Sequence, residues 1–124
     1  MELSERVAAM RAVIEAMPGA VADGPDVPGA RIYKVMGKMF AILSTRPAMQ
    51  AVNIKCDPHL IEILKEQYDG VGHRGHLDRR FWINVRLDAD VPREEVERLV
   101  AGSYDLIVKG LTKKQRSELA GISA

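Results

Sequence analysis

Three short β-type runs follow one another so closely that the connections between them constrain the fold. The runs cover residues 31–35, 38–43 and 49–56 and are rich in β-branched, aromatic and other apolar residues. Met36-Gly37 separates the first two runs, and a turn around Ser44 to Pro47 separates the second from the third. Because parallel strands need a crossover connection of about a dozen or more residues, these runs are predicted to pair as an antiparallel meander.

The third run and a later segment both show the period-2 alternation of a strand with one apolar face. In the third run, Val52 and Ile54 alternate with Asn53 and Lys55. In the later segment, residues 81–87, the apolar positions are Phe81, Ile83, Val85 and Leu87, and the positions between them are Trp82, Asn84 and Arg86. Both segments are therefore predicted to turn their apolar residues toward a core and to leave a polar face on the other side of the sheet.

An amphipathic helix is predicted over residues 4–17, with Ser4 as its N-cap. Its apolar stripe recurs at spacings of three and four residues and contains Val7, Met10 and Ile14. The next segment, 18–29, is rich in glycine and proline and is predicted to be a loop. Segment 71–78, with two glycines, is also predicted to be a loop.

Three further helices are predicted from the residues at their ends. Asp57-Pro58 supplies an N-cap and a first-turn proline for a helix that stops before Gly70. Another helix begins at Pro92, and Thr112 with Gln115 has the spacing of a capping box for a short C-terminal helix. The predicted order is α-β-β-β-α-β-α-α. This order predicts a two-layer α+β domain in which the helices cover one face of an antiparallel sheet.

The composition is typical of one globular domain spanning residues 1–124. The chain is 47% hydrophobic and 28% charged, and a domain of this length can fold without disulfides or a structural metal. Its single cysteine, Cys56, cannot form an internal disulfide, which favours a reducing, cytoplasmic location. No segment has the about 18 apolar residues of a membrane span, and the acidic N-terminal sequence is unlike a secretory signal. We therefore expect a cytosolic protein with no membrane contact.

The formal net charge of +1 conceals blocks of opposite sign. Residues 31–56 contain five basic residues and no acidic one, and residues 73–86 contain four basic residues and one acidic residue. The segments that flank these two blocks on the N-terminal side are acidic. Both basic blocks fall mainly on predicted strands, so basic side chains are expected on the sheet.

The motifs of nucleotide-dependent and metal-dependent enzymes are missing from the sequence. It has neither a phosphate-binding loop of the Gly-x-x-x-x-Gly-Lys-Ser/Thr type nor a Gly-x-Gly-x-x-Gly motif. His73 and His76 lack the paired cysteines of a zinc motif, even with Cys56 or His59 added, so no metal site is predicted. Cys56 and His59 have no orienting acid, and Cys56 is interpreted as a buried residue rather than a nucleophile. We expect no enzymatic activity, no catalytic residue and no cofactor.

Trp82 is the most informative residue of the polar strand face. Its parity places an aromatic ring beside Asn84 and Arg86, an arrangement that suits stacking on a nucleic-acid base or packing against a protein. The alternative is that a loop or the C-terminal helix covers Trp82, because tryptophan is usually mostly buried in folded proteins.

Six short segments, in a constant order along nearly the whole chain, carry a family resemblance. They are Gly37-Lys38-Met39-Phe40-Ala41, Ile54-Lys55-Cys56-Asp57-Pro58, Phe81-Trp82-Ile83-Asn84-Val85, Val91-Pro92, Ser103-Tyr104-Asp105-Leu106 and Leu111-Thr112-Lys113-Lys114-Gln115-Arg116. Together they resemble the MmcQ/YjbR family. The resemblance implies a compact α+β fold similar to the frataxin-like (CyaY-like) arrangement, and a family label of DNA-binding protein. One departure is Arg80-Phe81 before Trp82, where the family has Lys-His.

These observations predict a small non-enzymatic binding module that attaches to nucleic acid through a basic sheet face with an aromatic anchor. Attachment is expected to be electrostatic with limited base stacking, without a helix that reads the major groove. The predicted contact residues are Lys38, Lys55, Arg79, Arg80, Trp82 and Arg86. A scatter of the basic residues over both faces of the sheet would remove the main support for this hypothesis.

Two alternatives use other chemistry. A protein-interaction or regulatory domain would use the same face, with Trp82 as its anchor. A frataxin-like cation binder would need acidic residues near the first helix and the strand edges, and the available ones are Glu2, Glu5, Glu15, Asp23 and Asp26. Neither the oligomeric state nor the biological pathway follows from the sequence.

Overall fold

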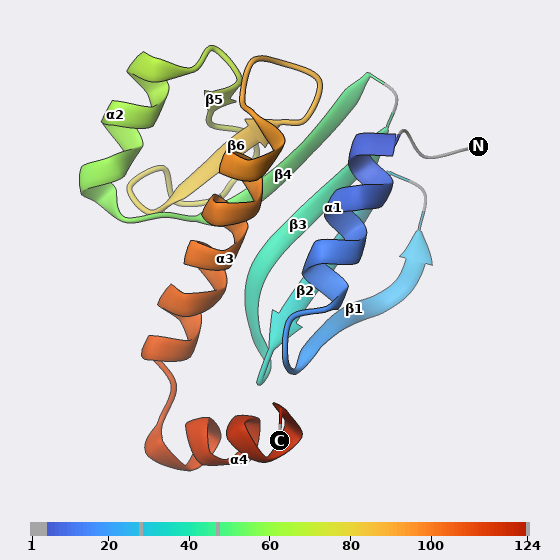
Figure 1. The fold of residues 1–124 in the computed structure, drawn as a ribbon, viewed down its shortest axis with the longest axis vertical. Coiled ribbons are helices and arrows are strands. Elements are labelled where there is room, and N and C mark those ends of the chain that lie inside the picture. The colour runs from blue at the N-terminus through green and yellow to red at the C-terminus, as the bar shows by residue number, and fades with distance from the viewer. Residues whose placement is uncertain (1–4, 28, 47, 124) are drawn as a thin grey trace.

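A computed structural model describes residues 5–27, 29–46 and 48–123 of the chain. The elements along these residues are α1 (Glu5–Glu15), β1 (Ala20–Val27), β2 (Ala30–Val35), β3 (Lys38–Arg46), β4 (Met49–Lys55), α2 (Pro58–Gln67), β5 (Val71–Gly72), β6 (Trp82–Arg86), α3 (Arg93–Lys109) and α4 (Lys113–Ser123). Figure 1 shows α1 and α3 crossing the same side of the sheet. None of the helices in these ranges is both long enough and apolar enough to span a membrane.

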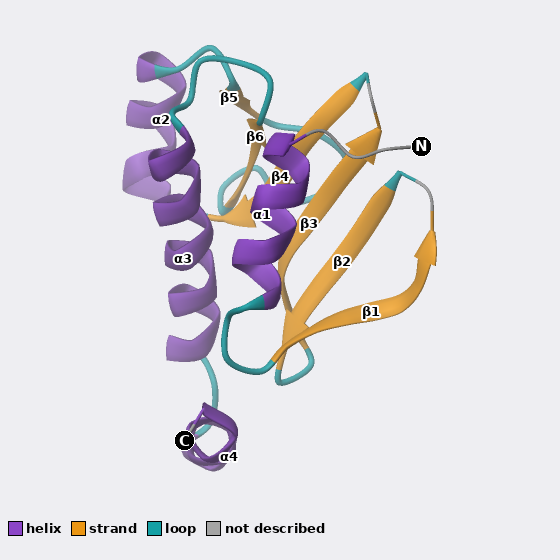
Figure 2. Cartoon of the chain, turned by 45° about the vertical axis from the view of Figure 1, so that its right-hand side comes forward, coloured by secondary structure: helices purple, strands orange, loops and turns teal. Residues whose placement is uncertain are grey.

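The six strands form one antiparallel sheet in the order β1-β2-β3-β4-β6-β5. Figure 2 shows the helices gathered on one side of this sheet, while the strands form the second layer. The predicted two-layer α+β class is therefore confirmed. The meander of β2, β3 and β4 has the antiparallel pairing that its short connections require.

The predicted loops at 18–29 and 71–78 were wrong in part, because each contains a strand. Residues 20–23 of β1 pair with β2, and the pairing is irregular between Asp23 and Val27. Gly24 and Pro25 lie in this irregular stretch, and an edge strand tolerates such residues because one side of it needs no partner. Strand β5 has only two residues and pairs with β6 at the opposite edge.

The predicted helix ends are largely confirmed by their hydrogen bonds. Asp57 Oδ1 accepts a 2.8 Å hydrogen bond from the His59 amide at the start of α2. The capping box of α4 is formed in both directions, from the Gln115 amide to Thr112 Oγ1 and from the Thr112 amide to Gln115 Oε1. Ser4, the predicted cap of α1, lies outside the described residues.

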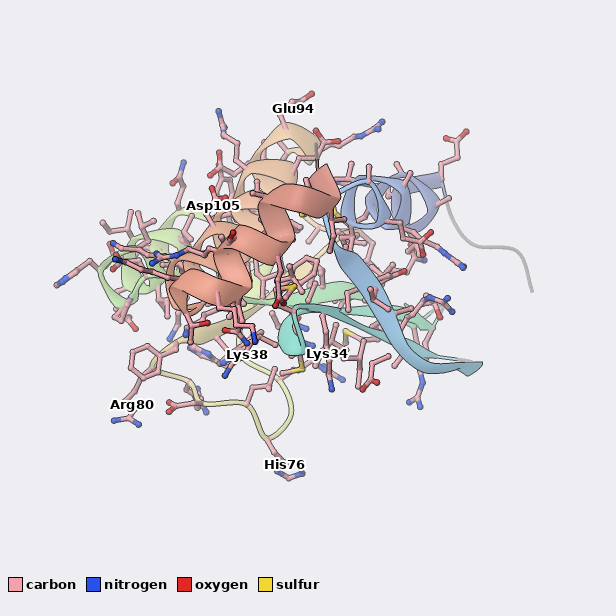
Figure 3. All side chains as sticks on the ribbon, turned by 90° about the horizontal axis from the view of Figure 1, so that it is seen from below. Lys34, Lys38, His76, Arg80, Glu94 and Asp105 are labelled. Atoms are coloured by element: carbon pink, nitrogen blue, oxygen red, sulfur yellow. The ribbon has the colours of Figure 1, made fainter. Side chains whose placement is uncertain are left out.

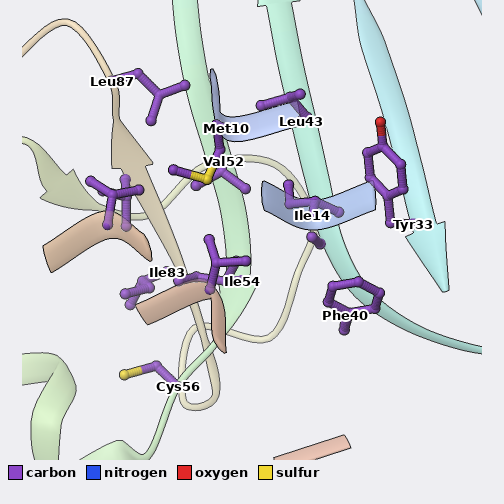
Figure 4. Close-up of a cluster of buried hydrophobic side chains, with 14 of the residues drawn as sticks. Met10, Ile14, Tyr33, Phe40, Leu43, Val52, Ile54, Cys56, Ile83 and Leu87 are labelled. Carbon is purple, nitrogen blue, oxygen red and sulfur yellow. The ribbon is translucent and has the colours of Figure 1, made fainter. Parts of the chain in front are cut away.

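The core lies between the sheet and the helices α1 and α3. Ile14 is fully buried, as the apolar stripe of α1 predicts, and Figure 4 shows Met10 and Ile14 among side chains of the sheet. The fully or almost fully buried residues of the sheet include Tyr33, Val35, Phe40, Leu43, Val52, Ile54, Ile83 and Val85. This core holds the central strands flat against the helices and leaves their other face without a helical cover.

A β-bulge in β3 changes which side chains share a face. Tyr33 pairs with Ala41 but its neighbour Lys34 pairs with Met39, so Phe40 is the extra residue. Phe40 is fully buried, as is the adjacent Ala41, whereas an uninterrupted strand would place neighbours on opposite faces. The residues of β3 that precede the bulge therefore point to the opposite face from the one that strict alternation would give them.

Candidate functional site

The strand pair β4–β6 presents three directly opposed residue pairs on the face away from the helices. Lys55 lies opposite Trp82, Asn53 opposite Asn84, and Ala51 opposite Arg86. The pairs between them, Ile54–Ile83 and Val52–Val85, are buried in the core. The predicted parity of Trp82, Asn84 and Arg86 is thus confirmed, and we refer to the surface around Lys55, Trp82, Asn53, Asn84 and Arg86 as the open face.

Trp82 is half-buried. The sequence had left open whether its ring is exposed on the polar face or covered by another segment, and the structure lies between these alternatives. Its backbone oxygen lies 3.1 Å from Nδ1 of His73, which follows β5. This contact joins the loop 73–81 to the start of β6 and holds the backbone of Trp82. The side chain of Trp82 remains accessible in part.

A row of side chains crosses the open face from β2 to β6. Ile32 of β2 lies opposite Ile42 of β3, which in turn lies opposite Asn53. Asn84 Nδ2 donates a 3.2 Å hydrogen bond to Asn53 Oδ1 across β4 and β6. The apolar half of the row is half-buried, and in the amide half Asn53 is half-buried while Asn84 is buried, with 5% of its surface exposed.

Arg86 is paired with Asp88 at the end of β6. Its Nε and terminal nitrogen each donate a 2.9 Å hydrogen bond to one carboxylate oxygen of Asp88. These hydrogen bonds lower the pKa of Asp88 and raise that of Arg86. The pair leaves this part of the open face with little net charge.

Arg80 is paired in the same way with Asp78 in the loop before β6. The two hydrogen bonds measure 3.1 and 2.8 Å, and the side-chain hydrogen bond from Arg80 lowers the pKa of Asp78 to about 2. The guanidinium carbon of Arg80 also lies 5.3 Å from the centre of the Phe81 ring. Arg80 therefore already has a counter-ion and an aromatic neighbour.

Lys55 and Arg79 are the predicted cations of this region that carry no ion pair within the described residues. Lys55 is half-buried at the end of β4, and Arg79 is exposed in the loop beside Arg80. Lys34, which the sequence did not single out, also belongs to the sheet face away from the helices but contacts Asp23 at 2.9 Å. The uncompensated positive charge is therefore concentrated at the Lys55 end of the open face.

Lys38 was wrongly grouped with this surface. It lies opposite Val35, which is fully buried on the helix side, so the register assigns Lys38 to the other face of the sheet. Figure 3 shows Lys38 well apart from Arg80. The β-bulge at Phe40 is the physical reason, because one extra residue reverses the parity of the residues before it.

Arg31 also belongs to the helix side. It lies opposite the buried Leu43, and its Nε is 3.8 Å from the carboxylate of Glu15 in α1. With Lys38, it splits the basic block 31–56 between the two faces. The scatter that removes the main sequence-based support for the nucleic-acid hypothesis is therefore present in that block.

Asp78 and Asp88 are the site residues that sequence reasoning missed. Each lies two residues from the arginine that it neutralises, and both arginines are bound bidentately. An Asp-x-Arg or Arg-x-Asp spacing beside a strand was the available signal. The apolar row through Ile32 and Ile42 was also missed, because the sequence reveals alternation along a strand but not which strands are neighbours.

The residues considered for metal or nucleophilic chemistry do not come together. Within the described ranges, no three His, Cys, Asp or Glu side chains are placed to hold one metal ion. Cys56 is buried, as predicted, and burial raises the pKa of its thiol to about 11, which keeps it protonated at neutral pH. His59 is exposed on α2, and Figure 3 shows His76 at the tip of its loop.

Two acidic residues of the cation-binding alternative, Glu15 and Asp23, have other partners. Glu15 accepts a 2.6 Å hydrogen bond from the Tyr33 hydroxyl and a 3.1 Å hydrogen bond from Arg11 Nε. Asp23 is paired with Lys34. Glu2 and the side chain of Asp26 lie outside the described residues.

A groove on the helix side is a second surface of interest. It lies between α2 and α3 and has a volume of about 420 Å³. Its apolar lining includes Cys56, Leu60, Leu99 and Leu106, and its charged lining includes Lys55, Asp57, Glu95, Arg98, Asp105 and Lys109. Arg98 and Glu95 form an ion pair with each other.

Comparison with known proteins shows which family has this fold and this arrangement of segments. The YjbR family model matches residues 15–106. The uncharacterized YjbR protein of Escherichia coli K12 is 32% identical over 104 residues, which cover 84% of this chain and 88% of that protein. The chain belongs to the YjbR family. A second relative, the uncharacterized YbdF protein of Escherichia coli O157:H7, is 24% identical over 95 residues, covering 77% of this chain and 78% of that protein.

Solved structures agree with membership of the YjbR family. The crystal structure of a Deinococcus radiodurans protein with a DUF419 domain superposes with a TM-score of 0.81 at 30% identity, covering 92% of this chain and 87% of that one. A Pseudomonas syringae protein superposes with a TM-score of 0.68 at 19% identity, covering 80% and 96% of the two chains, and shows a shared fold. The YjbR match contains the whole open face and ends within α3, so α4 lies beyond it.

Proposed function

We propose that this YjbR-family chain is a non-enzymatic binding module that takes single-stranded nucleic acid on its open face. The observation that carries the proposal is the direct opposition of Lys55 and Trp82 on neighbouring strands. The exposed part of the half-buried indole offers a surface on which a base can stack, and the Lys55 ammonium group, which has no ion-pair partner in the described residues, attracts the phosphate of the same strand. The paired amides of Asn53 and Asn84 lie next to both.

Lys55 and Arg79 carry most of the electrostatic attraction in this proposal. Arg80 and Arg86 contribute less, because a phosphate has to compete with Asp78 and Asp88 for their guanidinium groups. Exposed ion pairs of this kind contribute only about 0–1 kcal/mol, so a phosphate can displace the aspartate at a small cost in binding free energy. Lys38 has no part in the surface. Weak, strongly salt-dependent binding is the expected behaviour.

A protein partner is the second candidate for the same face. The half-exposed Ile32 and Ile42 face each other in the middle of the sheet, and neither neutralises phosphate nor stacks on bases. Apolar side chains among charges of both signs are typical of protein interfaces. A partner that covered this row would also cover Trp82.

The decisive experiment is a fluorescence-anisotropy titration with a labelled oligothymidine of about 15 nucleotides at several salt concentrations. Lys55→Ala is expected to weaken binding and to reduce the slope of log K against log salt by about 0.7, because the variant neutralises one phosphate fewer. Lys38→Ala removes the same charge from the other side of the sheet and serves as the matched control, with affinity and slope unchanged. Equal effects of the two variants would contradict a localised site.

Failure to bind is also informative. If the folded wild-type protein shows no affinity for the oligonucleotide even at low salt, the nucleic-acid proposal is wrong. The protein-partner candidate then becomes the proposed function of the open face, because the apolar row and Trp82 remain a surface that a protein could cover.

A further inference from the structure

The residues that line the groove between α2 and α3 include a glycine of α3, Gly102. Gly102 is exposed within the 17-residue helix α3, and a Cβ added there meets no atom within 4 Å. Glycine is a poor helix former, and no close packing within the described chain explains its presence here. A glycine at such a position allows the backbone of another segment to approach the helix closely.

The charged residues of α3 in the groove are arranged symmetrically about Gly102. Glu95 lies seven residues before it and Lys109 seven residues after it. Arg98 and Asp105 lie four residues before and three residues after. Each acidic residue on one side therefore has a basic residue at a matching distance on the other side.

The apolar residues follow the same symmetry. Leu99 and Leu106 lie three residues before and four residues after Gly102, and both are only half-buried. On the neighbouring helix α2, Leu60 lines the same groove and is 46% exposed. These side chains are the apolar surface that a partner at the groove would cover.

We propose that the partner is a second copy of this chain, bound so that the two α3 helices pack antiparallel about a twofold axis through Gly102. In an interface with twofold symmetry, every contact between two different residues of the two copies occurs twice. Glu95 and Arg98, which pair with each other in the single chain, then exchange partners: Glu95 lies beside Lys109 of the second copy, and Arg98 beside Asp105 of the second copy. Leu99 and Leu106 face each other across the axis, and the two glycines permit the close approach.

Charge complementarity is the reason to choose a second copy over a different partner. Along α3 the groove residues are acidic, basic, small, acidic and basic in turn. A second α3 in the antiparallel direction places an opposite charge beside each of these charges, and an unrelated helix would not in general do so. The interface uses the helix side of the molecule and leaves Trp82 on the other face of the sheet, and of the open-face residues only Lys55 also borders the groove. It therefore goes beyond the proposed function and does not depend on it.

Sedimentation velocity over a range of concentrations tests the interface by charge exchange. The wild-type protein is expected to form dimers with a Kd in about the micromolar range. Glu95→Lys alone and Lys109→Glu alone each place like charges together twice, and each is expected to raise the Kd on the order of tenfold. Glu118→Lys makes the same charge change on α4, outside the groove, and is expected to leave the Kd unchanged.

Mixing the two single variants is the sharpest arm of the experiment. A Glu95→Lys chain and a Lys109→Glu chain are complementary at both positions, so the mixture is expected to form heterodimers although each protein alone is weakened. The double variant Glu95→Lys/Lys109→Glu is expected to dimerise like the wild type. Absence of rescue in both arms, or a wild type that stays monomeric up to about 1 mM, overturns the proposal.

Gly102→Gln tests the close approach separately. The glutamine side chain fills the space at the axis and is expected to abolish the dimer. The substitution also replaces a poor helix former with a better one, so the thermal midpoint of the monomer is expected to stay level or rise. Loss of the dimer in a well-folded protein supports the interface, and a dimer that persists contradicts it. Sedimentation is measured on the protein without oligonucleotide and Lys55 is left unchanged, so failure of the dimer and failure of oligonucleotide binding are distinguishable results.

Discussion

The buried hydroxyl of Ser103 in α3 donates a 2.7 Å hydrogen bond to the backbone oxygen of Phe40. The same hydroxyl accepts a 2.9 Å hydrogen bond from the amide of Lys55. It thereby joins β3 and β4 just beyond Ala41 and Ile54, the last residues that the two strands pair directly. A single side chain from the helix layer thus connects the two strands where their direct pairing ends, and it fixes the backbone of Lys55.

Ser103→Ala is expected to lower the free energy of unfolding by about 1–3 kcal/mol, because it leaves a buried amide and a buried carbonyl without this partner. Urea unfolding followed by circular dichroism measures the change. Ser117→Ala, at an exposed position of α4, is the control and should stay within about 0.5 kcal/mol of the wild type. A Ser103→Ala protein as stable as this control would show that the bridge contributes little.

Ile14→Ala is expected to cost about 2–4 kcal/mol, through lost burial and the cavity left between α1 and the sheet. The measurement is again a denaturant titration, with Val21→Ala at a 63% exposed position as the control. A loss below about 0.5 kcal/mol would mean that α1 is peripheral to the core.

Tyr33 makes stability depend on alkaline pH. Burial, and then the hydrogen bond to Glu15, raises the pKa of its hydroxyl to about 12. The folded state therefore holds this proton more tightly than the unfolded state, whose tyrosines titrate near 10. The stabilisation is complete below about pH 10 and is lost as the pH rises toward 12. The free energy of unfolding should fall over that range, and it should fall less steeply in Tyr33→Phe; equal slopes would contradict the linkage.

Asp88→Asn is expected to strengthen oligonucleotide binding by a few-fold, because it frees Arg86 to contact phosphate. The slope of log K against log salt should steepen by about 0.7 at the same time. The control is Asp69→Asn, which removes one exposed negative charge from the end of α2. If both variants strengthen binding equally, the effect reflects net charge rather than a contact at the open face.

Trp82→Ala is expected to weaken single-strand binding by about 1–3 kcal/mol while leaving the salt slope unchanged, because an indole neutralises no phosphate. The anisotropy titration measures both quantities, and a urea titration of the same protein measures its stability. A variant that unfolds at markedly lower urea and loses all binding would assign Trp82 a structural role instead.

Local sequence signals predicted most of the secondary structure. The period-2 alternation of residues 81–87 set the face of Trp82, and the cap residues Asp57 and Thr112 marked the starts of two helices. These signals are reliable because they depend on neighbours within a few residues: the pleat of one strand, or the unpaired amides of one helix turn.

The irregular elements could not be predicted in this way. Strand β1 contains glycine and proline and exists because β2 supplies its hydrogen-bond partners along one edge. Lys38 lies on the helix side because Phe40 is an extra residue in β3, and this bulge is visible only in the pairing of β2 with β3. A one-residue change of register reverses every later side chain, so a small tertiary feature outweighs the pattern of the whole strand.

The sequence by itself determined an α+β chain with four helices, an antiparallel meander and a strand that turns Trp82, Asn84 and Arg86 to one side. The tertiary structure decided which charges are available at that surface. Asp78 and Asp88 neutralise two predicted cations, the bulge moves a third to the other face, and Lys55 is placed opposite Trp82. The physical reason is range: helix and strand preferences act between near neighbours in the sequence, whereas the effective charge of a surface depends on which segments the completed sheet brings together.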